Sequence, residues 1–471
     1  MITRGRTLRE PRRELPIAGT YDVVVAGGGP SGICAAVAAA RAGARTLLVE
    51  RYGFLGGIAT AGWVDLLLGI APARTGEMVV GGLFRELVDE MAALGCARPF
   101  DEGIRAARIP FEPEAFKLVA DAMVLGSGAD LLLHSSVGEA IVEGDRLRAL
   151  VLEGKSGARA IEASVFVDAT GDADVVARAG ARWEMGRPAD GRVQAMSMIL
   201  QMGGLDVDRV PTRGGAGDEQ VKALTHEALL AGLPAYRWHT PERSPDTRQD
   251  SLAFNVTHLS GDPTDVADLT RAETKGRRDA REIARWMREA VPGMERSHLQ
   301  LTAHMVGVRE SRRMVGRETV TGEDVLSGRK RPDAIARCTF GLDVHCPMAH
   351  TGPQAAQVNG VACRQSCGKR DCHMLTRHLD EVPEHGGVAD RSWYDIPWGA
   401  LVSADLRNLL TCGRSVSADH QAMASLRVMG PAMATGQAAG EGAALAVNSG
   451  DLVEVDVTEL QRRLRDTGAC C

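Results

Sequence analysis

A glycine-rich turn between an apolar strand and an alanine-rich helix constrains the fold of this chain more than any other feature. Gly27, Gly29 and Gly32 follow an apolar run, and Pro30 opens the expected helix. In such a turn the first glycine permits a tight bend, the second leaves room for a pyrophosphate, and the third lets the helix pack closely on the strand. Glu50 ends the next apolar run, where its carboxylate can accept hydrogen bonds from ribose hydroxyls. The sequence therefore predicts a dinucleotide site, with the helix N-terminus directed at the phosphates.

Length and charge narrow the class of protein. The chain has 471 residues, which predicts two lobes because one simple core rarely grows so large. Its net charge of −6 gives no reason to expect nucleic acid or an anionic membrane as a partner. No apolar run reaches the roughly 18–20 residues of a membrane span. The arginine-rich N-terminal segment lacks the apolar stretch of a secretory signal, so we expect a cytoplasmic protein with reduced cysteines.

Hydrophobic periodicity predicts an α/β protein. A βαβ start over residues 21–50 is followed by helical patterns and then by short strands between residues 129 and 167, whose Gly-Asp and Ser-Gly turns are typical of a β-meander. We expect a Rossmann-like nucleotide-binding lobe with a parallel sheet and a small meander, plus an α+β substrate domain. The predicted segments are a leader (1–20), the nucleotide-binding lobe (21–190), the substrate domain (191–345), a Cys-rich insertion (346–392), the C-terminal part of the nucleotide-binding lobe (393–449) and a C-terminal helix and tail (450–471).

Several segments together resemble one protein family. They are Tyr21–Glu50, Gly53–Thr60, Val167–Asp174, Gly307–Arg313 and Asn408–Gly440. In this order they are similar to the FAD-dependent oxidoreductases related to heterodisulfide reductase, over most of residues 20–345 and 393–449. The resemblance implies a Rossmann-like fold that holds one FAD, and the presence of a single complete glycine motif agrees with one tightly held cofactor. Phe54 and Leu55 stand where some relatives carry a tethering histidine, so we expect non-covalent FAD.

The resemblance also implies which residues hold the cofactor. Glu50 and Arg51 would hold the adenosine ribose, and the backbone of Val137 would bind the adenine. A helix that opens near Gly436 would direct its positive N-terminus at the flavin; close packing in a core is the alternative for this small-residue helix, and both can hold. Carried over to this chain, the cofactor-binding positions are Gly27, Gly29, Pro30, Ser31, Gly32, Glu50, Arg51, Gly56, Gly57, Val137, Ala169, Gly171, Asp172, Gly413, Arg414, Gly436 and Gln437.

Two arginines and a histidine are candidates for catalysis. Flavin chemistry needs an acid or base for the accompanying proton, and cations if the substrate is an anion. Arg309 and Arg312 lie three positions apart, so a helix would place both on one face. The alternative is a structural set of ion pairs with Glu310 and Glu318. The resemblance places the arginines and His345 near the flavin, where the imidazole could carry a proton; the alternative for His345 is a structural histidine.

Cysteines gather in the predicted insertion. Cys346, Cys363, Cys367 and Cys372 could hold an iron–sulfur cluster or a zinc ion, because both take four such ligands. Relatives of the family sometimes carry a [4Fe–4S] cluster, although the spacing here matches neither common ferredoxin pattern. Unligated thiols on a loop and a redox disulfide are the alternatives.

These features together predict an FAD-dependent oxidoreductase. It would transfer two electrons, as a hydride at flavin N5, to or from a small organic substrate, which is anionic if the arginines bind it. The alternative is an electron-transfer module that couples FAD to an iron–sulfur site and a protein partner. A non-catalytic flavin-binding protein is a third alternative. The sequence leaves open the substrate, the electron acceptor and whether copies of the chain associate.

Overall fold

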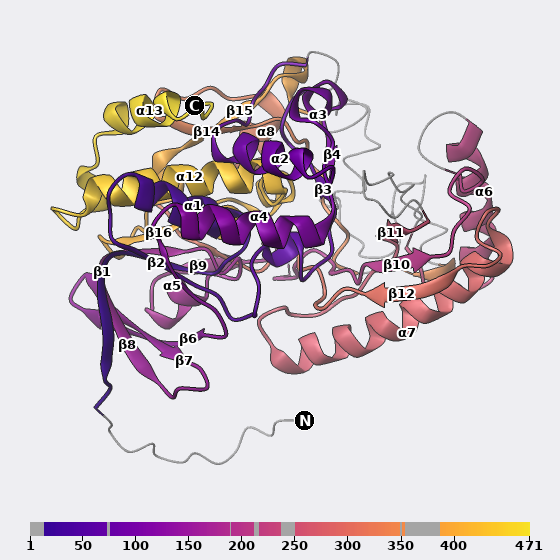
Figure 1. Cartoon of the computed structure of the whole chain (residues 1–471), viewed down its shortest axis with the longest axis horizontal. Helices are drawn as coiled ribbons and strands as arrows, with labels where there is room; N and C mark the ends of the chain where they lie inside the picture. The colour runs from indigo at the N-terminus through magenta and orange to yellow at the C-terminus, as the bar shows by residue number, and fades with distance from the viewer. Residues whose placement is uncertain are drawn as a thin grey trace.

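The chain folds into two lobes that lie side by side (Figure 1). The computed structural model describes residues 14–72, 76–188, 190–211, 216–236, 250–348, 351–353 and 387–471. The larger lobe surrounds sheet A, and the smaller lobe combines a three-stranded sheet with the long helix α7 (Val266–Ala290). None of the described helices is long and apolar enough to cross a membrane.

Sheet A is mostly parallel and carries the predicted meander at one edge. Its strands follow the order β5-β2-β1-β8-β7-β6, with β16 beside β8. Pairing is parallel among β5, β2, β1, β8 and β16, and antiparallel from β8 to β7 and from β7 to β6. The strands are β1 (Ile17–Ala26), β2 (Thr46–Val49), β5 (Asp130–Leu132), β6 (Ser136–Glu143), β7 (Arg146–Glu153), β8 (Arg159–Asp168) and β16 (Leu409–Thr411). The Rossmann-like α/β fold with a meander is confirmed.

Alternating side chains of sheet A enter two different hydrophobic clusters. On β1, Val23 and Val25 face one cluster, whereas Val24 and Ala26 face the other, as the pleat of a strand requires. The first cluster contains residues of α1 (Pro30–Arg41), α2 (Leu83–Ala93), α4 (Pro113–Gly126) and α12 (Met429–Ala446). The second contains residues of β7 and of α5 (Asp174–Arg178). The central strands are therefore buried on both faces, which explains their continuous apolar runs.

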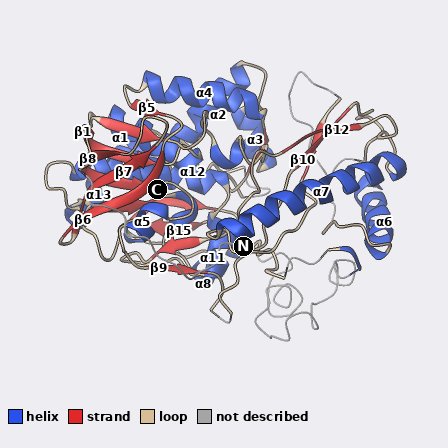
Figure 2. Ribbon diagram, turned by 90° about the horizontal axis from the view of Figure 1, so that it is seen from below, coloured by secondary structure: helices blue, strands red, loops and turns tan. Residues whose placement is uncertain are grey.

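The smaller lobe has its own core. Antiparallel strands β10 (Leu200–Gly203), β11 (Leu252–Phe254) and β12 (His298–Thr302) share it with α7 and with α6 (Ala216–Leu230). Figures 1 and 2 both show α7 running beside β10 and β12. The Asp265 side chain accepts hydrogen bonds from the first N–H groups of α7 and so fixes where this helix begins.

Two strand pairs connect the segment that follows the smaller lobe to the larger lobe. β13 (Arg312–Met314) pairs with β9 (Trp183–Met185), and β14 (Ala334–Cys338) pairs with β15 (Tyr394–Pro397). Residues 334–338 thus pair with a strand outside the predicted substrate domain. The remaining short elements are η1 (Gly57–Ala59), β3 (Leu66–Leu67), α3 (Phe100–Ala106), β4 (Ile109–Pro110), α8 (Gly322–Ser327), η2 (Ala389–Arg391), η3 (Trp398–Ala400), η4 (Gly413–Ser415), α11 (His420–Leu426), η5 (Leu452–Glu454) and α13 (Val457–Asp466).

The contact between α1 and α12 generates a stability prediction. A Cβ added at Gly436 would overlap the carbonyl oxygen of Ser31, which is backbone and cannot move aside cheaply. Gly436→Ala should therefore lower the free energy of unfolding by about 1–3 kcal/mol, as overpacking of a core usually does. Gly126→Ala is the matched control, because a Cβ there meets nothing within 4 Å. Denaturant unfolding of both variants checks this, and a Gly436→Ala protein as stable as the control would contradict it.

Candidate cofactor site

A long cavity opens where the carboxyl ends of the parallel strands face the smaller lobe. It encloses about 940 Å³. Gly27 follows β1, Glu50 follows β2, Ala169 follows β8 and Gly413 lies just beyond β16, and all four line it. Ser197, Asn255 and other residues of the smaller lobe form the facing wall. This edge of an open parallel sheet is where such folds bind their ligands.

The glycine turn has the geometry that a diphosphate requires. Gly27 has a φ of +105°, and a Cβ there would overlap the backbone of Ala169. Gly32 packs so closely on the carbonyl of Gly27 that no side chain fits. A Cβ on Gly29, by contrast, meets no protein atom within 4 Å, and this residue lines the cavity. No side chain caps the first turn of α1, so its N–H groups are left for a phosphate.

The carboxylate of Glu50 is held in place at the cavity wall. Its Oε2 accepts a hydrogen bond from the N–H of Gly28 at 2.6 Å, and its Oε1 accepts one from Tyr52 N–H at 2.8 Å. These two bonds fix the side chain beside the turn while the remaining lone pairs stay available. Any side chain at Gly29 would fill the open space beside the turn, and the fixed carboxylate of Glu50 lies next to it. This arrangement fits the ribose–diphosphate part of a dinucleotide.

Most of the residues predicted to hold the cofactor line this one cavity. They are Gly27, Gly29, Pro30, Ser31, Glu50, Arg51, Gly57, Val137, Ala169, Gly171, Asp172, Gly413 and Arg414. Gly32 and Gly56 are not among its lining residues; Gly32 packs on the turn itself, and a Cβ on Gly56 would press on Thr60. The structure therefore brings together residues from four strand ends, as the resemblance implies, although direct contact with FAD stays a prediction.

The helix expected to open near Gly436 begins earlier than predicted. α12 starts at Met429, and Val428, Met429 and Ala432 line the cavity. Gly436 lies inside the helix and packs closely against α1. Gln437 is also turned away from the cavity: its Oε1 accepts a hydrogen bond from Leu83 N–H at 2.9 Å, at the start of α2. Neither residue is among those that line the cavity, and the helix end that faces it is the one at Met429; contact of Gly436 or Gln437 with FAD stays a prediction.

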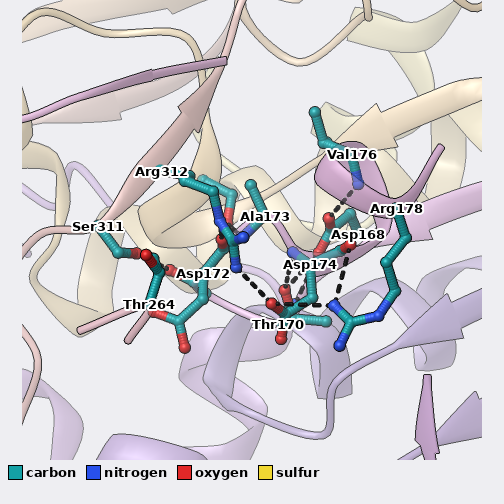
Figure 3. Close-up of polar contacts among 12 residues, drawn as sticks. Asp168, Thr170, Asp172, Ala173, Asp174, Val176, Arg178, Thr264, Ser311 and Arg312 are labelled. Carbon is teal, nitrogen blue, oxygen red and sulfur yellow. Dashed lines mark hydrogen bonds and ion pairs between the residues drawn. The ribbon is translucent and has the colours of Figure 1, made fainter. Parts of the chain in front are cut away.

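Arg312 contacts the loop that follows β8, and the segment that carries Arg309 and Arg312 is not a helix. Residues 307–311 have no regular secondary structure, and Arg312 begins β13. Its Nε donates to Asp172 O at 2.8 Å, and its Nη2 pairs with Asp174 at 2.5 Å. Figure 3 shows Arg312 and Arg178 reaching Asp174 from opposite sides. Arg312 does not line the cavity, and its ion pair is with Asp174 and not with Glu310 or Glu318, so a catalytic role for it stays a prediction.

A buried carboxylate stabilises the same loop. Asp168 accepts hydrogen bonds from the N–H of Thr170 at 3.0 Å, from its hydroxyl at 2.6 Å and from Val176 N–H at 3.0 Å (Figure 3). Burial raises the pKa of Asp168 to about 6, because a charged carboxylate is costly in the interior. On the cavity side, Arg414 pairs with Asp172 at 3.0 Å. These contacts fix the turn that places Ala169, Gly171 and Asp172 along the cavity.

Arg309 and His345 line the cavity where it meets the smaller lobe. Arg309 is buried; its Nη1 donates to Ala195 O at 2.5 Å and its Nη2 to Asn255 Oδ1 at 3.4 Å. His345 is buried too, and its Nε2 lies 3.3 Å from Asp343 Oδ2. Burial and then the charge of Arg309 hold the pKa of His345 well below 6.5, so the imidazole is neutral at pH 7.

Arg427 was not singled out by sequence reasoning, yet it lines the cavity beside these two residues. Its Nη2 donates to Asp343 O at 2.8 Å and lies 3.0 Å from Asp343 Oδ2. The sequence contained one signal for it: Arg427 is a single cation that stands directly before α12, which is apolar and rich in small residues. Its relation to Asp343 could not be read from the sequence, because the two lie far apart along the chain.

The cysteine cluster is outside what the structure can test. Cys363, Cys367 and Cys372 lie outside the described residues, and Cys346 is buried. Within the described ranges no group of three or more His, Cys, Asp or Glu side chains could hold a metal ion. An iron–sulfur cluster or zinc ion at these cysteines therefore has no structural support.

The open position at Gly29 generates a prediction about the cofactor. Gly29→Val should fold normally, because no protein atom would meet the new Cβ within 4 Å, but it should lose bound flavin. The isopropyl group would occupy the space beside the N-terminus of α1 where the diphosphate is expected. Flavin absorbance per protein after reconstitution, together with the far-ultraviolet circular dichroism, is the measurement. A variant that stays fully yellow would refute the site.

Comparison with individual proteins gives short or distant matches. Dihydrolipoyl dehydrogenase of Trypanosoma brucei brucei is 56% identical over 46 residues, which are 10% of this chain and 10% of that protein. A geranylgeranyl bacteriochlorophyll reductase-like protein from Thermoplasma acidophilum aligns with a TM-score of 0.45 and 14% identity, over 95% of this chain and 84% of that one. The OxyS anhydrotetracycline hydroxylase from Streptomyces rimosus aligns with a TM-score of 0.41 and 14% identity, over 94% and 64%. These structural likenesses are too distant to carry an argument about function.

A family model gives a much more extensive match. The model described as FAD dependent oxidoreductase matches residues 22–464, which include the glycine turn, both lobes and the start of α12. FAD is the cofactor that this family implies, and the glycine turn, Glu50 and the cavity beside them fit it. The chain belongs to the FAD-dependent oxidoreductase family and is an enzyme of that class.

Proposed function

We propose that the enzyme oxidises or reduces a small organic anion by two-electron transfer, with Arg309 and His345 beside the reacting atoms. The observation that carries this proposal is that a buried guanidinium and a buried neutral imidazole line the same cavity as the glycine turn. Bound FAD would supply the chemistry, which we take to be hydride transfer at the flavin N5. If Glu50 holds the adenosine half, the flavin half would lie toward the smaller lobe, where these side chains are.

His345 is suited to carry the proton of the reaction. Its Nε2 is directed at the carboxylate of Asp343, which favours the tautomer with the hydrogen on Nε2. Its Nδ1 is buried and has no hydrogen-bond partner among the described residues. In this tautomer Nδ1 is an acceptor, so it can take the proton of a substrate hydroxyl or amine during oxidation and return it during reduction.

Arg309 is suited to bind the substrate anion. Its two hydrogen bonds to Ala195 and Asn255 hold the guanidinium against the cavity wall, so little conformational entropy is lost when it binds a ligand. A guanidinium presents planar, paired donors that match a carboxylate. Burial strengthens this interaction because water does not screen it there.

The alternative of an electron-transfer module has no comparable observation in its favour. It needs a cluster at four cysteines, of which only Cys346 lies among the described residues. The narrower relationship to heterodisulfide reductase and the non-covalent state of FAD stay predictions. Iron and sulfide analysis of anaerobically purified protein would separate the module from the substrate-oxidising enzyme.

Arg309→Ala should reduce turnover while the flavin spectrum stays intact. Loss of a buried charge-assisted hydrogen bond costs about 1.5–3 kcal/mol, or roughly 10–100-fold in kcat/KM. The substrate for this assay is any metabolite that bleaches the bound flavin in an anaerobic screen, followed by stopped-flow absorbance. Unchanged kinetics would return Arg309 to a structural role.

The acid limb of the pH profile should report His345. A base works only when neutral, so flavin reduction should slow as the pH falls through the pKa of His345, which lies well below 6.5. Arg309→Met removes a positive charge that lowers this pKa, so the limb should move toward higher pH. The measurement is kcat/KM against pH for both proteins. A parent limb at or above pH 6.5, or one that the variant does not move, would exclude His345 as the base.

A further inference from the structure

Three buried polar atoms on the cavity wall have no hydrogen-bond partner among the described residues. They are Ser197 Oγ, His345 Nδ1 and Arg427 Nε, and all three side chains line the cavity. Ser197 is 3% exposed and His345 is 6% exposed. Buried polar atoms in proteins are nearly always paired, because leaving one unpaired costs about 1–3 kcal/mol. Their convergence on one cavity indicates a place prepared for a polar ligand.

Hydrogen bonds tie these atoms into a single cluster. Asp343 joins two of the side chains that carry these atoms, since it contacts His345 Nε2 at 3.3 Å and Arg427 Nη2 at 3.0 Å. The segment that contains Ser197 joins the other side of the cluster. Its Ala195 carbonyl accepts the hydrogen bond of Arg309, and Gln194 Oε1 accepts one from His345 N–H at 3.2 Å. Both lobes therefore contribute to one group of side chains around His345.

Two guanidinium groups line the cavity near His345. Arg309 and Arg427 both belong to the cavity wall, together with the neutral imidazole of His345 and the carboxylate of Asp343. Asp343 pairs with Arg427 at 3.0 Å. The fully buried Glu310 pairs with Arg313 and with His420 at 2.8 Å, and its charge also acts on Arg427. A guanidinium presents planar, paired donors that match a carboxylate, so this part of the wall is suited to an acidic ligand.

Apolar side chains complete the wall near the cluster. Leu68, Ile199 and Phe340 line the same cavity. Ser425 Oγ, close to Arg427 in the chain, donates to the backbone carbonyl of Phe340, which ties this part of the wall to the segment that carries Arg427. The body of the ligand that this wall accommodates is apolar, and polar groups are needed only at the end that meets the arginines.

We propose that Arg427 is a substrate-binding residue that selects acids, and that the substrate is a carboxylate with an apolar body. Its carboxylate would be held between Arg309 and Arg427, and its oxidisable hydroxyl or amine would lie at His345 Nδ1 with Ser197 beside it. This rests on the proposed function and adds the chemical class of the substrate. It also explains why a second arginine lines a cavity that already contains Arg309.

A pair of isosteric probes tests the proposal without any turnover. The FAD-loaded enzyme is titrated with benzoate and, separately, with the neutral analogue benzamide, and the change in flavin absorbance gives each Kd. We expect benzoate to bind at least about 10-fold more tightly, which is the order of one charge-assisted hydrogen bond. Arg427→Met should abolish this preference, and Arg427→Lys should restore part of it because the charge returns.

Arg337→Met is the matched control. This part-buried arginine pairs with Asp395 and with the carbonyl of Cys471, and it does not line the cavity, so the preference for benzoate should persist. Equal binding of the two probes by the parent enzyme, or binding of neither, would overturn the proposal even if the variants fail to fold. A preference that survives Arg427→Met would assign Arg427 to the flavin itself and also overturn it. Failure of every metabolite to reduce the flavin would instead contradict the proposed function and leave the probe preference standing.

Discussion

Close approach of backbone to backbone around the first glycine turn is the constraint on which the rest of the structure depends. Gly32 packs on the carbonyl of Gly27, and Gly436 packs on the carbonyl of Ser31, so α1 lies against both β1 and α12 without any side chain between them. This contact brings the end of β1 and the start of α12 to one cavity. The diphosphate space beside Gly29 exists because the surrounding backbone is so tightly fixed.

The second physical feature is the low dielectric of the cavity where the two lobes meet. Burial keeps His345 neutral, makes the charges of Arg309 and Arg427 effective, and leaves Asp343 to orient both His345 and Arg427. Burying charged groups has a desolvation penalty, so such a set adds little net stability. Apolar side chains of similar volume could replace it at little cost to the folded protein. Its presence beside the cofactor space supports the proposed catalytic role of these side chains.

The sequence predicted those parts of the structure that local pattern controls. The βαβ start follows from periodicity and the glycine turn, and the lining of the cavity by Gly27, Glu50 and Gly413 follows from the resemblance. The spacing of Arg309 and Arg312 would suit one face of a helix, but Arg312 lies in β13, because spacing carries no information on tertiary partners.

Tertiary pairing determines the rest. Arg312 lies in a strand that pairs with β9, and Arg427 meets Asp343 across a long stretch of chain.

The most direct test of the central claim compares FAD with FMN, which lacks the adenosine half. Titrated into the apoprotein and followed by flavin fluorescence, FAD should bind one per chain and far more tightly than FMN, because the turn at Gly29 and the carboxylate of Glu50 serve only the dinucleotide. Equal affinity for FMN, or no binding of FAD, would contradict the account.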